Sequence, residues 1–237
     1  MAEDIEKFKK QIDYNFKNKA LLREALTHRT YAVENDLKYD NQRLEFLGDA
    51  VLEIILSEYL FNLYPNAAEG EMTKMRSAMV NQDSLAILAR KMDFGKFLLA
   101  GKGEIESGGC ERDSTLSDLF EAITGAFYLD AGFETIKKFI IELFKKEFPE
   151  PEKLLLGLNP KGMLQEYSQK KWGEAPAYEV INVSGPDHNP LFEVEVKVGQ
   201  ISATGQASSR KNAESQAAKT ALLRLAESDK SLMEMFS

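Results

Sequence analysis

The sequence predicts an all-α domain over residues 1–148 followed by a small α+β domain, in the order α-β-β-β-α, over residues 159–228. Up to residue 148 the apolar residues recur at helical spacing, and no segment requires a strand. Residues 149–158 begin with two prolines among charged residues, which is typical of a linker. After residue 159 apolar and polar residues alternate at strand spacing. Residues 229–237 are expected to form a tail outside both domains.

The first domain is expected to be helical along most of its length. Its predicted helices cover 3–30 (two helices with a turn near 14–18), 41–64, 69–92, 114–131 and 133–148. Asn81 is a residue type that caps helices, so a new helix should begin there within 69–92. Polar residues at 31–40 and five glycines within 95–112 predict loops.

The second domain changes periodicity from helix to strand and back. Phe192, Val194, Val196 and Val198 alternate with charged residues, which predicts a strand with one buried face. The full set of expected elements is a helix at 161–171, strands at 177–183, 191–198 and 201–207, and a helix at 210–226. Turn residues at 184–187 and 199–200 separate the strands.

Two predicted helices carry pairs of carboxylates among apolar residues. Glu45 and Asp49 are four residues apart, and Asp118 and Glu121 are three apart, so each pair lies on one face of its helix. Like charges at this spacing repel, and burial strengthens the repulsion. A divalent cation between the helices would remove it, and oxygen ligands suit Mg²⁺ or Mn²⁺.

Structural explanations of these carboxylates remain open at this point. Asp118 could belong to a capping box that begins at Thr115. Glu45 and Asp49 could instead pair with arginines such as Arg43 or Arg76.

Composition is that of an ordinary globular protein, with no apolar run of the ~18 residues that a membrane helix needs. The formal net charge of −8 argues against a simple nucleic-acid binder. Residues 159–228 are neutral, however, with eight Lys/Arg and eight Asp/Glu, so local basic patches would have to bind. The single cysteine, Cys110, and a start without signal-peptide character predict a cytoplasmic protein. Cys110 is expected to be a spectator thiol.

Several motifs resemble the ribonuclease III family over residues 5–226. The two main ones are NQRLEFLGDAVL at 41–52 and SDLFEAITGAFYLD at 117–130. Shorter matches are LTHR at 26–29, EMTKMRS at 71–77, GKGE at 101–104 and SGG at 107–109. The resemblance implies an endonuclease domain that cleaves double-stranded RNA and an α-β-β-β-α domain that binds it.

The resemblance also implies the residues that act. Glu45, Asp49, Asp118 and Glu121 would hold one or two Mg²⁺ ions, with Mn²⁺ as a substitute, and Asp49 and Glu121 would be catalytic. Cleavage would leave 5′-phosphate and 3′-hydroxyl ends with short 3′ overhangs, on ribosomal-RNA precursors and other structured RNAs. No organic cofactor and no membrane are implied. Phe46 would insert into the partner subunit of a homodimer.

The second domain resembles a double-stranded-RNA-binding domain, which recognises the shape of about 16 base pairs. The matching positions on its first helix, its second loop and the start of its last helix are Gln165, Glu166, His188, Ser209, Arg210 and Lys211. A helix N-terminus with Lys and Arg beside it suits phosphate binding.

Gln42 departs from the family pattern, which usually has Glu at that position. It should still line the site, with an altered rate or site preference as the expected result. A non-cleaving double-stranded-RNA-binding regulator and a metal-binding scaffold in a ribonucleoprotein are the alternative functions. His28 is expected to be a structural, hydrogen-bonded residue rather than a base, and Trp172 is expected to anchor its domain.

Overall fold

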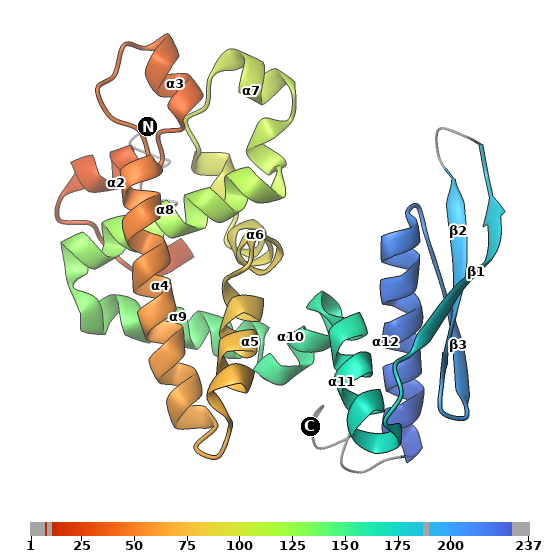
Figure 1. Ribbon diagram of the computed structural model, residues 1–237. Helices are drawn as coiled ribbons and strands as arrows, with labels where there is room; N and C mark the ends of the chain where they lie inside the picture. The colour runs from red at the N-terminus through yellow and green to blue at the C-terminus, as the bar shows by residue number, and fades with distance from the viewer. Residues whose placement is uncertain (1–7, 9–10, 187–189, 229–237) are drawn as a thin grey trace. The chain divides into compact units, whose positions relative to one another are not determined.

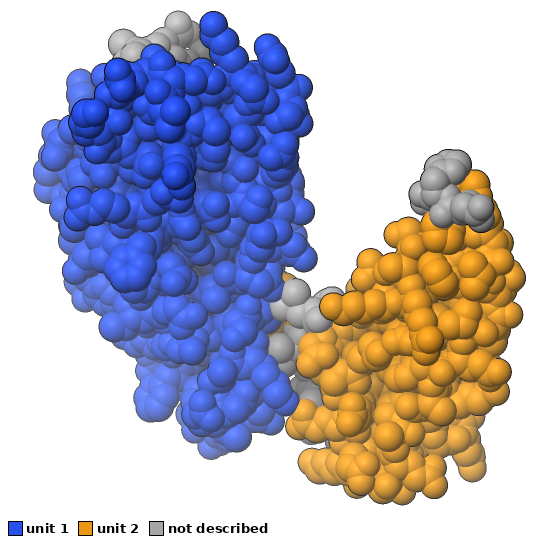
Figure 2. Space-filling model, turned by 45° about the horizontal axis from the view of Figure 1, so that its top comes forward, with its two compact units in different colours: residues 1–149 blue, residues 150–237 orange. Residues whose placement is uncertain are grey.

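The computed structural model describes residues 8, 11–186 and 190–228 of the 237-residue chain. The chain forms two compact units, Met1–Pro149 and Glu150–Ser237, which Figure 2 distinguishes by colour. Among the described residues, no helix is both long and apolar enough to cross a membrane.

The first unit is built from helices throughout its described part, which confirms the predicted all-α domain (Figure 1). Thr27 and Leu99 add one isolated bridge between extended segments. The longer helices are α2 (Lys19–Ala25), α3 (Arg29–Glu34), α4 (Gln42–Leu63), α5 (Glu69–Val80), α6 (Gln82–Lys91), α8 (Asp113–Ala131) and α9 (Phe133–Glu147). Three short ones are η1 (Phe94–Phe97), α7 (Lys102–Glu106) and η2 (Gly109–Glu111).

Side-chain caps explain where several helices begin. Asn18 accepts a hydrogen bond from the Ala20 N–H at 3.0 Å and begins α2. Asn81 accepts one from the Ser84 N–H at 2.8 Å, which confirms the helix start predicted there. His28 caps α3 in the same way.

Two predicted loops of the first unit were wrong in part. Residues 31–34 belong to α3 rather than to a loop, because the His28 cap begins a helix that composition alone did not indicate. The glycine-rich segment 95–112 contains most of η1, all of α7 and η2, with Gly108 at a φ of 70° between the last two. Short helical turns of this kind produce no long apolar period.

α4 and α8 cross in close contact at two glycines (Figure 1). A Cβ atom on Gly48 would lie 1.8 Å from the carbonyl oxygen of Glu121. A Cβ atom on Gly125 would lie 2.3 Å from the carbonyl oxygen of Leu44. The two backbones therefore touch, which any other residue at these positions would prevent. Around the crossing, Leu52, Leu119, Phe120 and Ile123 form part of the buried core.

The second unit is a three-stranded antiparallel sheet with helices packed against it, as the sequence predicts. Its elements are α10 (Pro151–Leu158), α11 (Pro160–Trp172), β1 (Ala177–Ser184), β2 (Leu191–Val198), β3 (Ile201–Ala207) and α12 (Arg210–Ser228). The strand order is β1-β2-β3, with Val196 opposite both Tyr178 and Ala203. A bulge interrupts β1 between Val180 and Asn182.

One face of this sheet is buried beneath α12, with α11 beside that helix (Figure 1). Val196, Leu164, Ala218 and Leu222 are fully buried in the shared core. Trp172 packs its ring edge-on against Tyr167, and a Cβ atom on Gly199 would meet the indole at 2.8 Å. Trp172 thus fixes the end of α11 against the β2–β3 turn.

The expected linker at residues 149–158 contains α10. This helix begins at Pro151, where a proline is well tolerated because the first helical N–H has no partner within the helix. Pro151, one of the two prolines that suggested a linker, therefore begins a helix.

The glycine contact predicts a large loss of stability for Gly48→Ala. The added methyl group forces α4 away from α8, and we expect a loss of about 3 kcal/mol or more in the free energy of unfolding. Urea denaturation of the full chain would measure it.

Gly70→Ala is the matched control, because a Cβ atom there has no neighbour within 4 Å and lies in helix α5. It should leave stability unchanged or raise it by up to about 1 kcal/mol. Equal behaviour of the two variants would contradict a backbone contact at Gly48.

Candidate active site

The helix crossing places the two carboxylate pairs on either side of one contact. Gly48 lies between Glu45 and Asp49 on α4, and it touches the backbone of Glu121 on α8. The acidic residues of α4 are therefore brought next to Asp118 and Glu121 by the same contact that joins the helices.

Three of the four predicted metal ligands converge. Glu45, Asp118 and Glu121 each offer a carboxylate oxygen, and these oxygens all lie within 4.8 Å of one another. Oxygens bound to a common Mg²⁺ lie about 2.0–2.1 Å from the ion, so a modest movement of side chains would bring this group into coordination distance. Asp49 is exposed and lies outside the group of three.

The electrostatics of the group favour a cation. Burial, followed by the charges of Asp49, Glu45 and Asp118, raises the pKa of Glu121 from 4.5 to about 8. Burial also raises the pKa of Glu45, and the charges of Asp118, Asp40 and Asp49 add to it. The pKa of Asp118 is raised by burial and lowered by His28. Asp49 thus belongs to the site electrostatically, although its oxygens lie farther away.

Two of the structural explanations of the carboxylates, pairing with Arg76 and a capping box at Thr115, are not supported. Arg76 binds Glu53 at 2.7 Å and donates to the Ser57 hydroxyl at 2.8 Å, so its guanidinium is used away from Glu45 and Asp49. α8 begins at Asp113, and Thr115 lies inside it. A capping box from Thr115 to Asp118 was therefore the wrong interpretation.

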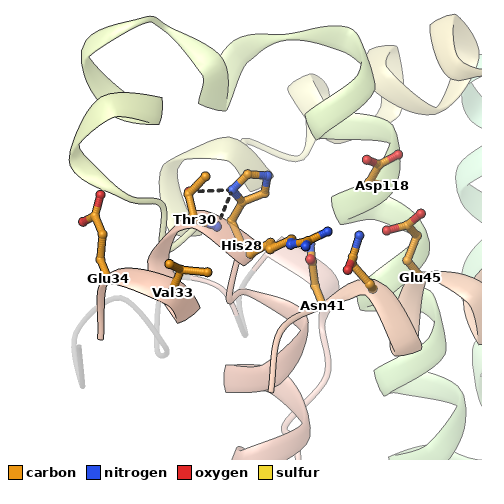
Figure 3. Close-up of a pocket in the computed structure, with 9 residues that line it drawn as sticks. His28, Thr30, Val33, Glu34, Asn41, Glu45 and Asp118 are labelled. Atoms are coloured by element: carbon orange, nitrogen blue, oxygen red, sulfur yellow. Dashed lines mark hydrogen bonds between the residues drawn. The ribbon is translucent and has the colours of Figure 1, made fainter. Parts of the chain in front are cut away.

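A cavity of about 430 Å³ opens beside the carboxylates (Figure 3). Its lining combines the acidic residues with one side of α3, from its first to its last residue, and with the start of α4. The lining residues are His28, Arg29, Thr30, Val33, Glu34, Asn41, Gln42, Glu45 and Asp118. Gln42 is exposed and lines this space, where the sequence placed it.

The predicted RNA-binding residues that the structure describes lie on α11 and at the start of α12. Gln165 and Glu166 are exposed on α11 and line a shallow pocket with Gly162, Gln169 and Lys170. Ser209 precedes α12 and accepts a hydrogen bond from the Asn212 N–H at 3.3 Å, while Arg210 and Lys211 are exposed in the first turn. His188 lies outside the described residues.

Gly48 and Gly125 bring the acidic helices together, and the sequence pattern did not single them out. Each interrupts an otherwise apolar helix, where glycine costs about 1 kcal/mol relative to alanine. A glycine that is kept within a helix despite this cost often indicates that another backbone packs closely against it. The sequence therefore contained a signal for both residues.

The chain matches two family models. Residues 18–147 match the model described as Ribonuclease-III-like, and residues 160–225 match the double-stranded RNA binding motif. Ribonuclease 3 of Campylobacter jejuni is 42% identical over 224 residues, which cover 94% of this chain and 98% of the relative. Ribonuclease 3 of Nitratiruptor is 40% identical over 93% of this chain and 96% of the relative.

The chain belongs to the ribonuclease III family. A solved nuclease domain of ribonuclease III from Campylobacter jejuni matches 62% of this chain and 99% of its own length, with 45% identity and a TM-score of 0.59. The chain is accordingly an endoribonuclease that acts on double-stranded RNA, with a helical nuclease domain and a C-terminal RNA-binding domain.

The raised pKa of Glu121 predicts a pH effect on the metal-free protein. The folded chain keeps a proton on Glu121 up to about pH 8, whereas the unfolded chain loses it near the ordinary value of 4.5. Stability should therefore fall as pH rises across this window. We expect a loss of about 1–3 kcal/mol between pH 5 and pH 8.5, since water reaches the site and screens part of the shift.

Unfolding in EDTA at several pH values, for the parent and for Glu121→Gln, measures this effect. The variant carries no titrating group at that position, so its pH slope should be shallower. Parallel slopes for the two proteins would show that the site does not hold a proton on Glu121.

Proposed function

We propose that the chain hydrolyses phosphodiester bonds of double-stranded RNA with Mg²⁺ held by Glu45, Asp49, Asp118 and Glu121, and that Mn²⁺ can replace Mg²⁺. Asp49 and Glu121 are the catalytic carboxylates of this proposal. The observation that carries it is the convergence of the Glu45, Asp118 and Glu121 oxygens within 4.8 Å of one another. Oxygen ligands alone suit a hard divalent cation.

The bound cation would activate water and stabilise the charge that develops on the phosphate. The carboxylates of the protein would position that cation. Burial, together with repulsion by the neighbouring carboxylates, raises the pKa of Glu121, and a divalent cation would offset this repulsion, so metal and site are matched in charge. Gln42 lines the same cavity with an uncharged amide, which can contact RNA without adding to the negative charge.

The products we propose are ends with a 5′-phosphate, a 3′-hydroxyl and short 3′ overhangs. The natural substrates we propose are precursors of ribosomal RNA and other structured RNAs, processed in the cytoplasm. Residues 1–148 serve as the nuclease domain, and residues 159–228 hold the duplex. In this second domain Gln165 and Glu166 face the minor groove, and Ser209, Arg210 and Lys211 bind phosphates.

A homodimer is part of this proposal. Phe46 on α4 is 80% exposed, and Ile54 and Phe61 on the same helix are 57% and 67% exposed. Large apolar side chains gathered on one helix favour a protein contact. The Campylobacter jejuni nuclease domain has a region involved in dimer formation. A second copy would also supply the second acidic site needed to cut both strands.

Cleavage of a long labelled RNA duplex tests the function. The parent should cut in Mg²⁺ and not in EDTA, and Glu121→Gln should lose at least about 100-fold in rate while it still binds duplex. Glu142→Gln, an exposed carboxylate on α9, is the control and should cut as the parent does. Tight binding by the parent without cutting would favour a regulator and would make Gln42→Glu the next variant.

Substitution of Phe46 tests the proposed homodimer. Phe46→Asp places a charge within the proposed apolar contact, so dimers should dissociate, with a rise in the dimer dissociation constant of at least about 10-fold. Sedimentation equilibrium measures this change. Val33→Asp, at an exposed apolar residue of α3, is the control and should leave the association unchanged. A dimeric Phe46→Asp protein would place the interface elsewhere.

A further inference from the structure

We propose that His28 contacts the substrate, donating a hydrogen bond from Nε2–H to a phosphate oxygen of the RNA held at the acidic group, with Thr30 and Gly101 as its positioning residues. This inference rests on the function proposed above. His28 is half-buried and lines the cavity that contains Glu45 and Asp118 (Figure 3). The sequence predicts only a structural role for it.

The hydrogen bonds around the ring decide which nitrogen is the donor. The Thr30 N–H points to Nδ1 of His28 at 3.4 Å, and the Thr30 hydroxyl lies 2.7 Å from the same nitrogen. That hydroxyl accepts a hydrogen bond from the Gly101 N–H at 3.0 Å, so its own proton is free to point at Nδ1. With two donors directed at Nδ1, the proton of the neutral ring lies on Nε2.

The donor faces the acidic side of the cavity. In Figure 3 the Nδ1 edge of the ring faces Thr30, and the opposite edge faces the side where Asp118 and Glu45 lie. No described residue accepts a hydrogen bond from Nε2. A carboxylate-rich cavity needs such donors if it is to hold a phosphodiester.

The backbone around His28 is fixed on both sides. The His28 N–H donates to the Leu99 carbonyl at 2.9 Å, and the Leu99 N–H donates to the Leu26 carbonyl at 2.7 Å. The Asn41 N–H, next to the start of α4, donates to the Thr27 carbonyl at 2.9 Å. Segments 26–28, 41 and 99 are thereby joined beside the acidic group. A donor held this way can act on the transition state without first being ordered.

The Gly101 position completes the chain of hydrogen bonds. A Cβ atom there would lie 2.5 Å from a carboxylate oxygen of Glu34 and 3.0 Å from the Cβ atom of Thr30. Glu34 in turn accepts from the Lys102 N–H at 3.0 Å. The close approach of residues 101–102 to α3 is what delivers the Gly101 N–H to Thr30.

His28→Asn separates the two roles of this residue. Asparagine is a strong helix cap and can accept from the Thr30 N–H, but it carries no group at the Nε2 position. We expect unchanged thermal stability and Mg²⁺ binding, with a single-turnover cleavage rate at saturating duplex about 10- to 100-fold lower. A rate within about twofold of the parent would overturn the proposal, as would a loss of rate explained by unfolding.

Thr30 provides the second variant pair. Thr30→Val keeps the shape and removes the hydroxyl, so the ring loses the partner that sets its tautomer, and kcat should fall while KM stays near that of the parent. Thr30→Ser restores the hydroxyl and should rescue kcat. A merely structural role predicts that both variants follow stability alone, and absence of rescue by serine would count against the positioning role.

A binding measurement keeps this inference separate from the proposed function. The chain has two histidines, His28 and His188, so side-chain NMR of labelled histidine gives two ring signals, and His188→Asn identifies them. In Glu121→Gln with Mg²⁺, added duplex RNA should shift the Nε2–H signal of His28. A parent that never cuts would refute the nuclease mechanism, whereas a His28 signal indifferent to bound duplex would refute the contact.

Discussion

The contact between α4 and α8 at Gly48 and Gly125 is the constraint on which the nuclease domain depends. Helices that carry ordinary side chains pack with their axes about 8–10 Å apart, which would hold the acidic residues farther from one another. Here the backbones of the two helices are in contact, and there is no room for a Cβ atom at either glycine. The same contact that closes the core therefore fixes the separation of Glu45 from Asp118 and Glu121.

This arrangement works against the stability of the metal-free fold. Three carboxylates are gathered in partly buried positions, and Asp49 and Asp40 add further negative charge nearby. The large apolar core of the domain, with Phe94, Phe120, Phe127 and Phe144 fully or nearly fully buried, offsets that repulsion. A site kept under electrostatic stress can bind a cation strongly, because binding removes a repulsion already present in the fold.

Much of this structure could be predicted from the sequence, because the patterns that indicate each element lie within the element itself. Helical spacing located α4 and α8, the capping preference of asparagine located the helix start at Asn81, and alternation located β2. The site could also be predicted in part, because charged residues within otherwise apolar helices are easy to recognise in a sequence. What was missed depends on distant segments: Asp49 lies outside the oxygen cluster, and the His28 ring is set by Thr30 and by Gly101, 73 residues later in the chain. No periodicity encodes such a hydrogen-bond chain.

The net negative charge of the whole chain is compatible with RNA binding, because binding depends on the charges at the contact surface rather than on their sum. In the second unit Glu214 binds both Arg210 and Lys161, so a carboxylate joins the start of α12 to the start of α11. This pairing holds the side chains of Arg210 and Lys161 at one carboxylate, and Lys211 is exposed beside Arg210 in the first turn of α12. A rigid cation gives up little conformational freedom when it binds a phosphate. Under the proposed function, a domain with no net positive charge would therefore still present ordered cations to the duplex.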